Sequence, residues 1–291
     1  MCIRDSSRGV ALSEASTGAS YGINVLAESN GDTQIGSAYV SKRFFGDMDF
    51  NKTTKEACWM AGSLLNAGKI SSGSRNIIMH PSVAVEFMDL ISAALSADAF
   101  QKKKSFLAGY LGSRGASENL TLIDDPHMHR GMASSAFDDE GIPTRKMEIF
   151  KQGILQNIYY DSYTAFKDGI KSTGNASRGS FKSLPSPGSS NLYIQPGSRP
   201  LEELIKDVQT GVYVLDVMGM HMVDTISGDF SVGISGLSIE KGCLSKPVRG
   251  LTLAGNLKQF LANIKEAGND IIFYGGSGSP SVLIEDLMIG G

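Results

Sequence analysis

Three glycine-containing turns, each between runs of β-forming residues, constrain most strongly how this chain can fold. These turns are Asn30-Gly31-Asp32, Lys151-Gln152-Gly153 and Glu240-Lys241-Gly242. Glycine and asparagine tolerate the left-handed backbone conformations that tight hairpin turns require. Each turn therefore predicts a pair of antiparallel strands, and the chain is expected to be rich in β-hairpins.

The alternation of apolar and polar residues extends this pattern along the whole chain. Strands are expected at 21–28, 35–42, 77–79, 120–123, 146–150, 154–160, 212–217, 230–240, 248–253, 271–274 and 281–289. Helices are expected at 54–67, 81–97, 162–168, 200–208 and 257–266. Thr53 or Thr54 is the expected cap of the first helix, and Ser198 that of the fourth. Because strands outnumber helices and lie in hairpins, the predicted class is α+β, with a large antiparallel β-sheet and packed helices after a smaller mixed segment.

Composition narrows the classes of function. The net charge is −3 with scattered basic residues, which argues against a nucleic-acid partner, because such proteins carry a broad basic surface. No apolar run reaches the ~20 residues that a membrane helix needs, and no secretory signal is visible. Three separated cysteines without a CxxC pair fit a reducing compartment. The expected location is therefore the cytoplasm, with no membrane partner.

Histidines are few, and none lies in a recognised catalytic motif. His127 and His129 follow a pair of aspartates, which suggests either a metal site or a polar surface loop. His221 lies among three methionines, so the alternatives are soft-metal binding and core packing. The segment 172–200 is rich in glycine, serine and proline, and loops of this length are usually functional or mobile. From the residues alone, no complete catalytic apparatus is visible.

Five stretches together resemble the TldD/PmbA metallopeptidase family, once described as modulators of DNA gyrase. The stretches are Phe137–Thr144, Lys171–Arg178, Ser190–Gly197, Ile226–Ser231 and Leu253–Leu257. They follow the order and spacing of that family, and the resemblance covers nearly all of residues 7–291. Residues 7–72 resemble the middle segment of the family, and 73–291 its C-terminal domain. Because family chains are longer, we expect an N-terminal α/β domain that is missing here, and we interpret residues 1–6 as a non-native scar.

The resemblance implies a peptidase of two subunits, one of which binds zinc through an HExxxH helix and a late cysteine. Here the motif falls on Met88 to Ala93, so Met88 and Ala93 replace the two histidines and Asp89 replaces the glutamate. The late cysteine has no counterpart in the turn at 275–280. The resemblance therefore implies a PmbA/TldE-like subunit without a metal site, a catalytic group or a cofactor of its own, with zinc expected in the partner.

The expected partners are a TldD-like zinc subunit and an unfolded peptide, and a homodimer remains possible. Asn175, Arg178 and Asn191, from the long polar loop, are the predicted substrate-binding residues, as donors to a peptide backbone. The loop at 172–197 is expected to be more mobile than its surroundings. Two alternatives stay open: a self-sufficient hydrolase that uses His127, His129 or His221, and a non-enzymatic binding protein.

Overall fold

The N-terminal part of the chain consists of two hairpins and a helix. The computed structural model describes residues 2–5, 7, 9–180 and 182–291, so parts of the predicted scar (1 and 6) and Phe181 of the polar loop lie outside the described residues. The elements of this part are β1 (Cys2–Asp5), β2 (Ala11–Glu14), β3 (Ala19–Ser29), β4 (Asp32–Lys42), η1 (Phe45–Asp47) and α1 (Phe50–Ser63). Asn30 and Gly31 have φ angles of 52° and 79°, which confirms the predicted tight turn between β3 and β4.

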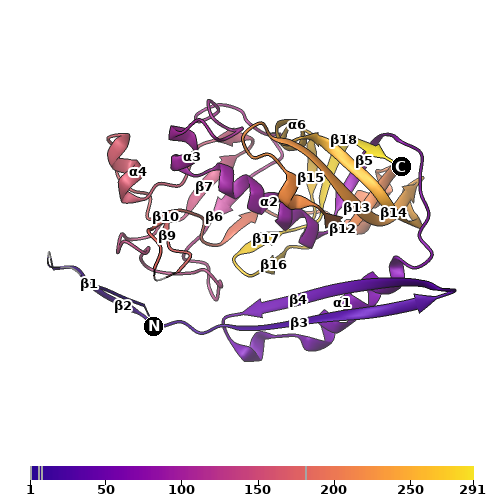
Figure 1. Ribbon diagram of the computed structural model, residues 1–291, viewed down its shortest axis with the longest axis horizontal. Helices are drawn as coiled ribbons and strands as arrows, with labels where there is room; N and C mark the ends of the chain where they lie inside the picture. The colour runs from indigo at the N-terminus through magenta and orange to yellow at the C-terminus, as the bar shows by residue number, and fades with distance from the viewer. Residues whose placement is uncertain (1, 6, 8, 181) are drawn as a thin grey trace.

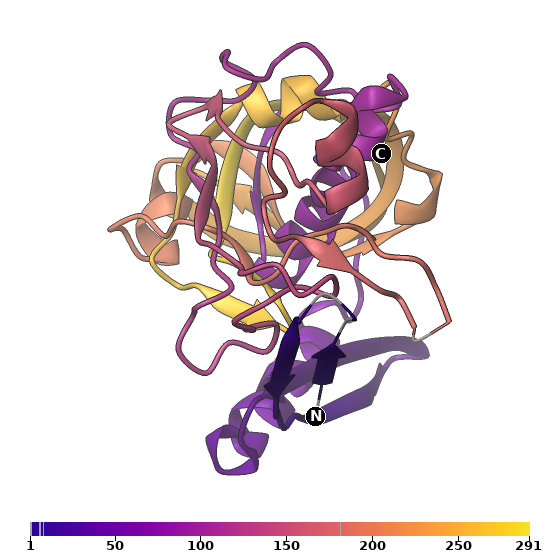
Figure 2. The same cartoon turned by 90° about the vertical axis from the view of Figure 1, so that its left-hand side faces the viewer.

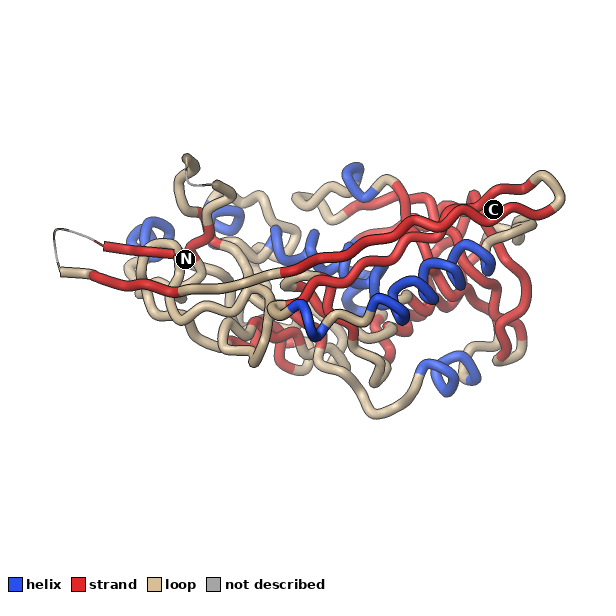
Figure 3. The backbone as a smooth tube through the Cα atoms, turned by 90° about the horizontal axis from the view of Figure 1, so that it is seen from below, coloured by secondary structure: helices blue, strands red, loops and turns tan. Residues whose placement is uncertain are grey.

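Helix α1 covers one face of the β3–β4 hairpin, and the two elements lie side by side along the molecule (Figure 3). The contact depends on Gly36, because a Cβ there would lie 2.1 Å from the carbonyl oxygen of Ala57. The opposite face of the hairpin is open, with Leu26 and Ile35 65% and 62% exposed. The predicted cap at Thr53 or Thr54 is wrong: α1 begins earlier because the Asp49 carboxylate accepts the N–H of Lys52 at 2.9 Å.

A six-stranded sheet forms the main body of the molecule. Its strands are β5 (Gly73–Met79), β12 (Thr210–Met218), β13 (Asp229–Glu240), β14 (Cys243–Asn256), β15 (Ile264–Ala267) and β18 (Val282–Gly290). Because β18 pairs with both β5 and β14, the sheet closes on itself. All of its pairs are antiparallel except β5 with β12, which is parallel. The predicted α+β class, with a dominant antiparallel sheet, is confirmed.

Helix α2 (Pro81–Ala94) lies within the curve of these strands (Figure 2). It begins with proline at its first turn, as the sequence predicts. Its apolar residues join the main core, where Phe87 stacks on Phe260 of α6 (Leu257–Ala262) with ring centroids 4.8 Å apart. The short helix α3 (Ala97–Gln101) follows α2. The core thus fixes the rotation of α2, and with it the residues that its outer face presents.

A second six-stranded sheet lies next to the first. Its strands, in order, are β16 (Ile272–Tyr274), β17 (Ser277–Ser279), β11 (Leu192–Ile194), β6 (Leu122–Asp124), β7 (Met147–Lys151) and β8 (Ile154–Leu155). The expected strand 154–160 is much shorter than predicted, because Tyr159 forms a bridge with Ser96 after α2 instead of continuing the pairing with β7. The remaining elements are α4 (Ser162–Lys167), β9 (Ala176–Ser177), β10 (Ser186–Pro187), α5 (Leu201–Lys206) and η2 (Met220–Met222). Figure 1 shows β16 and β17 between α2 and the β3–β4 hairpin.

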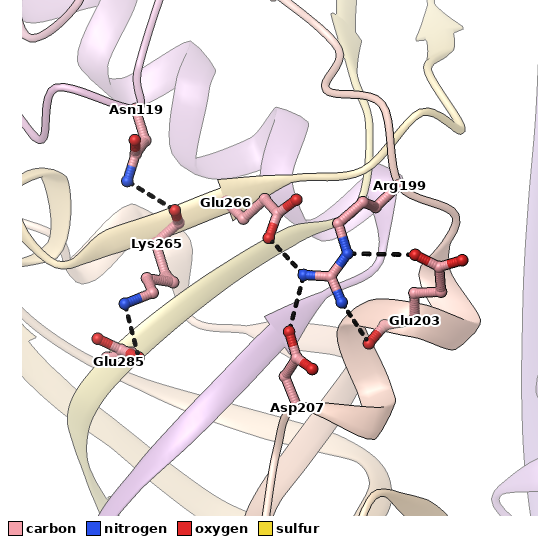
Figure 4. Close-up of polar contacts among 7 residues, drawn as sticks. All are labelled: Asn119, Arg199, Glu203, Asp207, Lys265, Glu266 and Glu285. Atoms are coloured by element: carbon pink, nitrogen blue, oxygen red, sulfur yellow. Dashed lines mark hydrogen bonds and ion pairs between the residues drawn. The ribbon is translucent and has the colours of Figure 1, made fainter.

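Arg199 anchors the end of the long polar loop to the closed sheet. Its guanidinium binds Glu203 and Asp207 around α5 and Glu266 on β15, at 3.2, 2.7 and 2.9 Å (Figure 4). These acidic groups raise the pKa of Arg199. Helix α5 has no side-chain cap, so the predicted capping by Ser198 is wrong.

Candidate functional site

The outer face of α2 meets the turn between β16 and β17. Asp89 is exposed on this face, and its Oδ1 accepts a hydrogen bond of 2.7 Å from the Ser277 hydroxyl. Ala93 is exposed on the same helix, whereas the Met88 side chain is only 2% exposed and belongs to the core. The structure thus brings together the helix and the late turn that resemble the zinc site of the family, but Met88 points away from their junction.

Two further carboxylates accompany Asp89. Glu86, one turn earlier on α2, has its pKa raised to about 7 by partial burial and by the charges of Asp216 and Asp89. Asp89 and Asp216 are exposed, but neighbouring protein atoms partly desolvate their carboxylates, which raises their pKa values. Tyr39 on β4 lies near these carboxylates, and its pKa is raised by partial burial and by the negative charges of Asp89 and Glu86. A carboxyl with a pKa near 7 can accept or donate a proton at neutral pH. Sequence reasoning missed Glu86, although its spacing of three residues from Asp89 places both on one helix face.

The residues at this junction do not fit a zinc ion. Structural and catalytic zinc sites use three or four histidine, cysteine or carboxylate ligands. Met88, Ala93 and Ser277 supply none of these, which leaves Asp89 as the single candidate ligand among the aligned positions. Within the described part of the chain, no group of three or more such side chains is close enough to hold a metal ion.

A groove of three adjoining cavities runs from the β16–β17 turn past the end of β4 to the segment that joins β2 to β3. Its first cavity, of about 350 Å³, lies between Lys42 at the end of β4 and Phe273 and Gly275 at the β16–β17 turn. The second, of about 560 Å³, shares His129, Arg130 and Gly131 with the first and is also lined by His127. The third, of about 270 Å³, shares Glu14, Arg43, Pro126, Ser134 and Ser135 with the second and reaches Asn175. The predicted residue Asn175 therefore lines the third cavity of this groove.

His127 in the groove does not act as a base toward the Thr144 hydroxyl beside it. The Nε2 of His127 lies 3.1 Å from the Thr144 hydroxyl, which itself donates to the Ser135 carbonyl at 2.5 Å. Because that hydroxyl proton is already used, the Nε2 atom donates to Thr144 and cannot accept its proton. His221 lies on a different element, η2, and is exposed. This geometry gives no support to a histidine-based hydrolase.

Asn191 is completely buried and holds the wall of the groove together. Its amide nitrogen donates to the Asp125 carbonyl at 2.8 Å and to the Ser134 hydroxyl at 2.9 Å, and its oxygen accepts from Ala133 N–H at 2.9 Å. Both donors are therefore occupied within the chain. The structure places Asn191 behind the groove rather than on its surface.

The other two predicted residues lie on either side of the β9–β10 pair. Asn175 is 7% exposed and donates to the Asp124 carboxylate at 3.0 Å and to the Gly188 carbonyl at 3.1 Å. Arg178 is exposed, and its guanidinium donates to the Ser183 carbonyl at 2.8 Å. The pairing of β9 with β10 gives this polar loop some regular structure; its mobility stays a prediction.

Comparison with known proteins identifies the family. Residues 72–291 match the family described as the PmbA/TldA metallopeptidase C-terminal domain, and the chain belongs to this family. It is 33% identical to metalloprotease PmbA of Escherichia coli O157:H7 over 286 residues, which are 98% of this chain and 61% of the relative. The whole chain thus spans about three fifths of that relative.

Two solved structures resemble the chain closely. A Thermotoga maritima protein described as a modulator of DNA gyrase superposes with a TM-score of 0.92 at 30% identity, over 98% of this chain and 65% of that one. TldE from Thermococcus kodakarensis superposes with a TM-score of 0.85 at 24% identity, over 94% and 63%, a likeness of fold alone. Among the helices of the described residues, none is both long and apolar enough to cross a membrane.

Proposed function

We propose that this chain is a PmbA/TldE-type subunit that holds unfolded peptide for a zinc-bearing, TldD-type partner in a cytoplasmic peptidase complex. The observation that carries the proposal is the junction of α2 with the β16–β17 turn. There, Asp89, which the resemblance places at the motif glutamate, is bonded to Ser277 of the late turn, and Met88 and Ala93 stand where the resemblance implies the two zinc-binding histidines. A subunit with this junction has no means of its own to generate a metal-bound hydroxide, so the partner would supply zinc and this chain no cofactor.

The groove supports a role in holding peptide. It runs beside the end of the long β4 strand, which pairs with β3 alone among the described strands, so the backbone N–H and C=O groups of its other edge are left without a strand partner. An extended peptide can pair with such backbone groups, and this mode of binding selects little for sequence. Unfolded peptides are therefore a better match than a defined small molecule. The net charge of −3 speaks against DNA as the ligand of a purely binding protein.

The test is reconstitution with an HExxxH paralogue from the same genome. We expect the two proteins to co-purify and to cleave an unfolded peptide, with activity lost on chelation and restored by zinc. The matched control is the paralogue with its motif glutamate changed to glutamine, which should assemble and remain inactive. Chelator-sensitive cleavage by this chain alone, at the rate of the complex, would contradict the proposal.

A further inference from the structure

Helix α4 turns its aromatic side chains outwards. Tyr163 and Phe166 are 63% and 84% exposed, whereas Thr164 and Ala165 between them are buried. A surface helix of a globular protein usually does the opposite and buries its most apolar side chains. Ile170, just after the helix, is half exposed and adds a third apolar side chain. We call Tyr163, Phe166 and Ile170 the α4 tip, and Figure 1 shows α4 at the edge of the molecule, away from the β3–β4 hairpin.

Hydrogen bonds at both ends of α4 hold the backbone of the tip in place. At the start, the Asp161 side chain accepts from the N–H of Thr164, and the Thr164 hydroxyl accepts from the N–H of Asp161, which completes a capping box. At the end, the N–H of Gly169 donates to the Phe166 carbonyl and that of Ile170 to the Ala165 carbonyl. Gly169 has a φ of 66°, so the helix ends in a Schellman motif. The exposure of the aromatic side chains is thus a feature of a well-ended helix and not of a frayed one.

A run of three lysines lies beside this tip. The run, Lys102 to Lys104, directly follows α3. Gln101, the last residue of α3, donates from its Nε2 to the Thr164 carbonyl of α4 at 2.8 Å. Figure 2 shows the two short helices next to each other. The tip and the lysines therefore form one continuous surface, although they are about sixty residues apart in the sequence.

Positive charge is in excess around the tip. Lys102 is paired with Asp98 at 2.7 Å, and the Nζ of Lys167 lies 4.0 Å from the centroid of the Tyr163 ring. Three further lysines are exposed and have no acidic partner in the described part of the chain, namely Lys103, Lys104 and Lys171. Two acidic side chains nearby accept hydrogen bonds from the chain itself, Asp168 from the Tyr160 hydroxyl and Glu140 from Ser162 N–H. Since the whole chain has a net charge of −3, this end is a local exception.

We propose that the α4 tip and the surrounding lysines bind the surface of an anionic membrane. Exposed aromatic and aliphatic side chains enter the boundary between lipid headgroups and acyl chains, and lysines around them attract anionic headgroups. The expectation of no membrane partner rested on the lack of a spanning apolar run, and binding at the surface needs no such run. This inference goes beyond the proposed function and does not depend on it.

The form of the tip favours a lipid surface over other anionic partners. Proteins that bind single-stranded nucleic acid use a basic groove in which several aromatic rings stack on bases. Here the rings project from a helix, one face of the Tyr163 ring is covered by Lys167, and Ile170 has no ring to stack. An acidic protein would need a pocket shaped for this projection, whereas a bilayer takes up apolar side chains of any shape.

Co-sedimentation of the full chain with lipid vesicles tests the proposal. One set of vesicles is an equal mixture of phosphatidylglycerol and phosphatidylcholine, and the other is phosphatidylcholine alone. We expect binding to the anionic vesicles to be tighter by on the order of tenfold or more, because each lysine near an anionic surface contributes about a fivefold gain. Binding should be largely lost at about 1 M salt, where charges are screened over ~3 Å.

The first pair of variants tests the lysines. Lys103→Gln combined with Lys104→Gln should weaken binding to the anionic vesicles by on the order of tenfold or more. Lys55→Gln combined with Lys246→Gln removes the same charge from exposed positions on α1 and β14 and should change binding by less than about twofold.

The second set of variants tests the apolar contact. Phe166→Ala should weaken binding roughly tenfold, the size expected for one phenyl ring that leaves water. Leu26→Ala, at a side chain that is 65% exposed on the β3–β4 hairpin, is the control and should have no effect. Phe166→Trp should restore binding, and its tryptophan emission should shift to the blue with anionic vesicles but not with neutral ones. Because all these side chains are exposed, each variant should keep the circular dichroism of the wild type.

The opposite results overturn the proposal in distinct ways. Equal binding to both kinds of vesicle, or binding that Phe166→Ala and the lysine variant leave unchanged, refutes the membrane surface. Binding of oligouridylate or of a polyglutamate peptide, lost in Phe166→Ala while vesicles stay unbound, assigns the tip to another partner and also refutes it. None of these assays measures peptide cleavage, so the inference can fail while the proposed function stands, and the reverse.

Discussion

Replacing Asn191 with leucine separates a structural role from a direct role in peptide binding. The sequence interpretation makes Asn191 a donor to the peptide. In the structure, its amide group is already hydrogen-bonded to Asp125, Ala133 and Ser134. Leucine has the same branching but is larger, and its side chain makes no hydrogen bond. At about 1 kcal/mol for each lost bond, and more where a partner is left unpaired, Asn191→Leu should lower the free energy of unfolding by about 2–4 kcal/mol.

Urea unfolding, followed by circular dichroism and by the fluorescence of the single tryptophan, measures this loss. Amide exchange in 126–136 should also be faster in the variant, because this loop is what Asn191 holds. Asn24→Leu on the open face of the β3–β4 hairpin is the control and should change stability by less than about 0.5 kcal/mol. An Asn191→Leu protein with wild-type stability and lost peptide affinity would refute the structural role and restore the direct one.

Three further predictions follow from the same structure. Asp89→Asn in the assembled complex should keep the cleavage rate within a few-fold; a loss of roughly 10²–10⁴-fold would identify Asp89 as a general base. Gly36→Ala should lower thermal stability by about 1–3 kcal/mol, because its Cβ meets the Ala57 carbonyl, whereas Gly62→Ala, which has open space, should not. Burial lowers the pKa of His80 from 6.5 to about 4. Because the folded chain takes up this proton less readily than the unfolded chain, the His80 contribution to the free energy of unfolding is fully present above pH 6.5. It is lost as the pH falls towards 4, by about 3 kcal/mol. The free energy of unfolding of His80→Asn, measured over the same pH series, should fall by less.

Local chemistry predicted many elements of the fold correctly. The hairpin at Asn30-Gly31 and the proline-initiated α2 are confirmed because a few adjacent residues determine them. The expected helix 257–266 is only partly correct, because α6 ends at Ala262 and the chain continues as β15, paired with β18. The parallel pair of β5 and β12 joins segments far apart in sequence, so no local pattern reveals it.

The candidate site, like the fold, could be predicted only in part from the sequence. The correspondence with the family placed the motif helix and the late turn, and the structure brings them together through Asp89 and Ser277. The spacing of Glu86 and Asp89 indicates their shared helix face, but it could not show the raised pKa of Glu86, because that depends on desolvation in the folded chain and on Asp216 from another strand. Nor could the sequence separate Asn175 from Asn191. Both are asparagines in one polar loop. Only the structure shows that Asn175 lines the groove, whereas Asn191 is buried behind it and hydrogen-bonded to its wall.

The most direct test of the account is the zinc content and peptidase activity of this protein as an HExxxH paralogue is added. We predict that the chain alone contains no stoichiometric zinc and cleaves no unfolded peptide. Chelator-sensitive activity should rise with added paralogue and level off at equal amounts of the two proteins. About one tightly bound zinc per chain before any paralogue is added, with cleavage that His127→Ala or His129→Ala abolishes, would contradict the central claim.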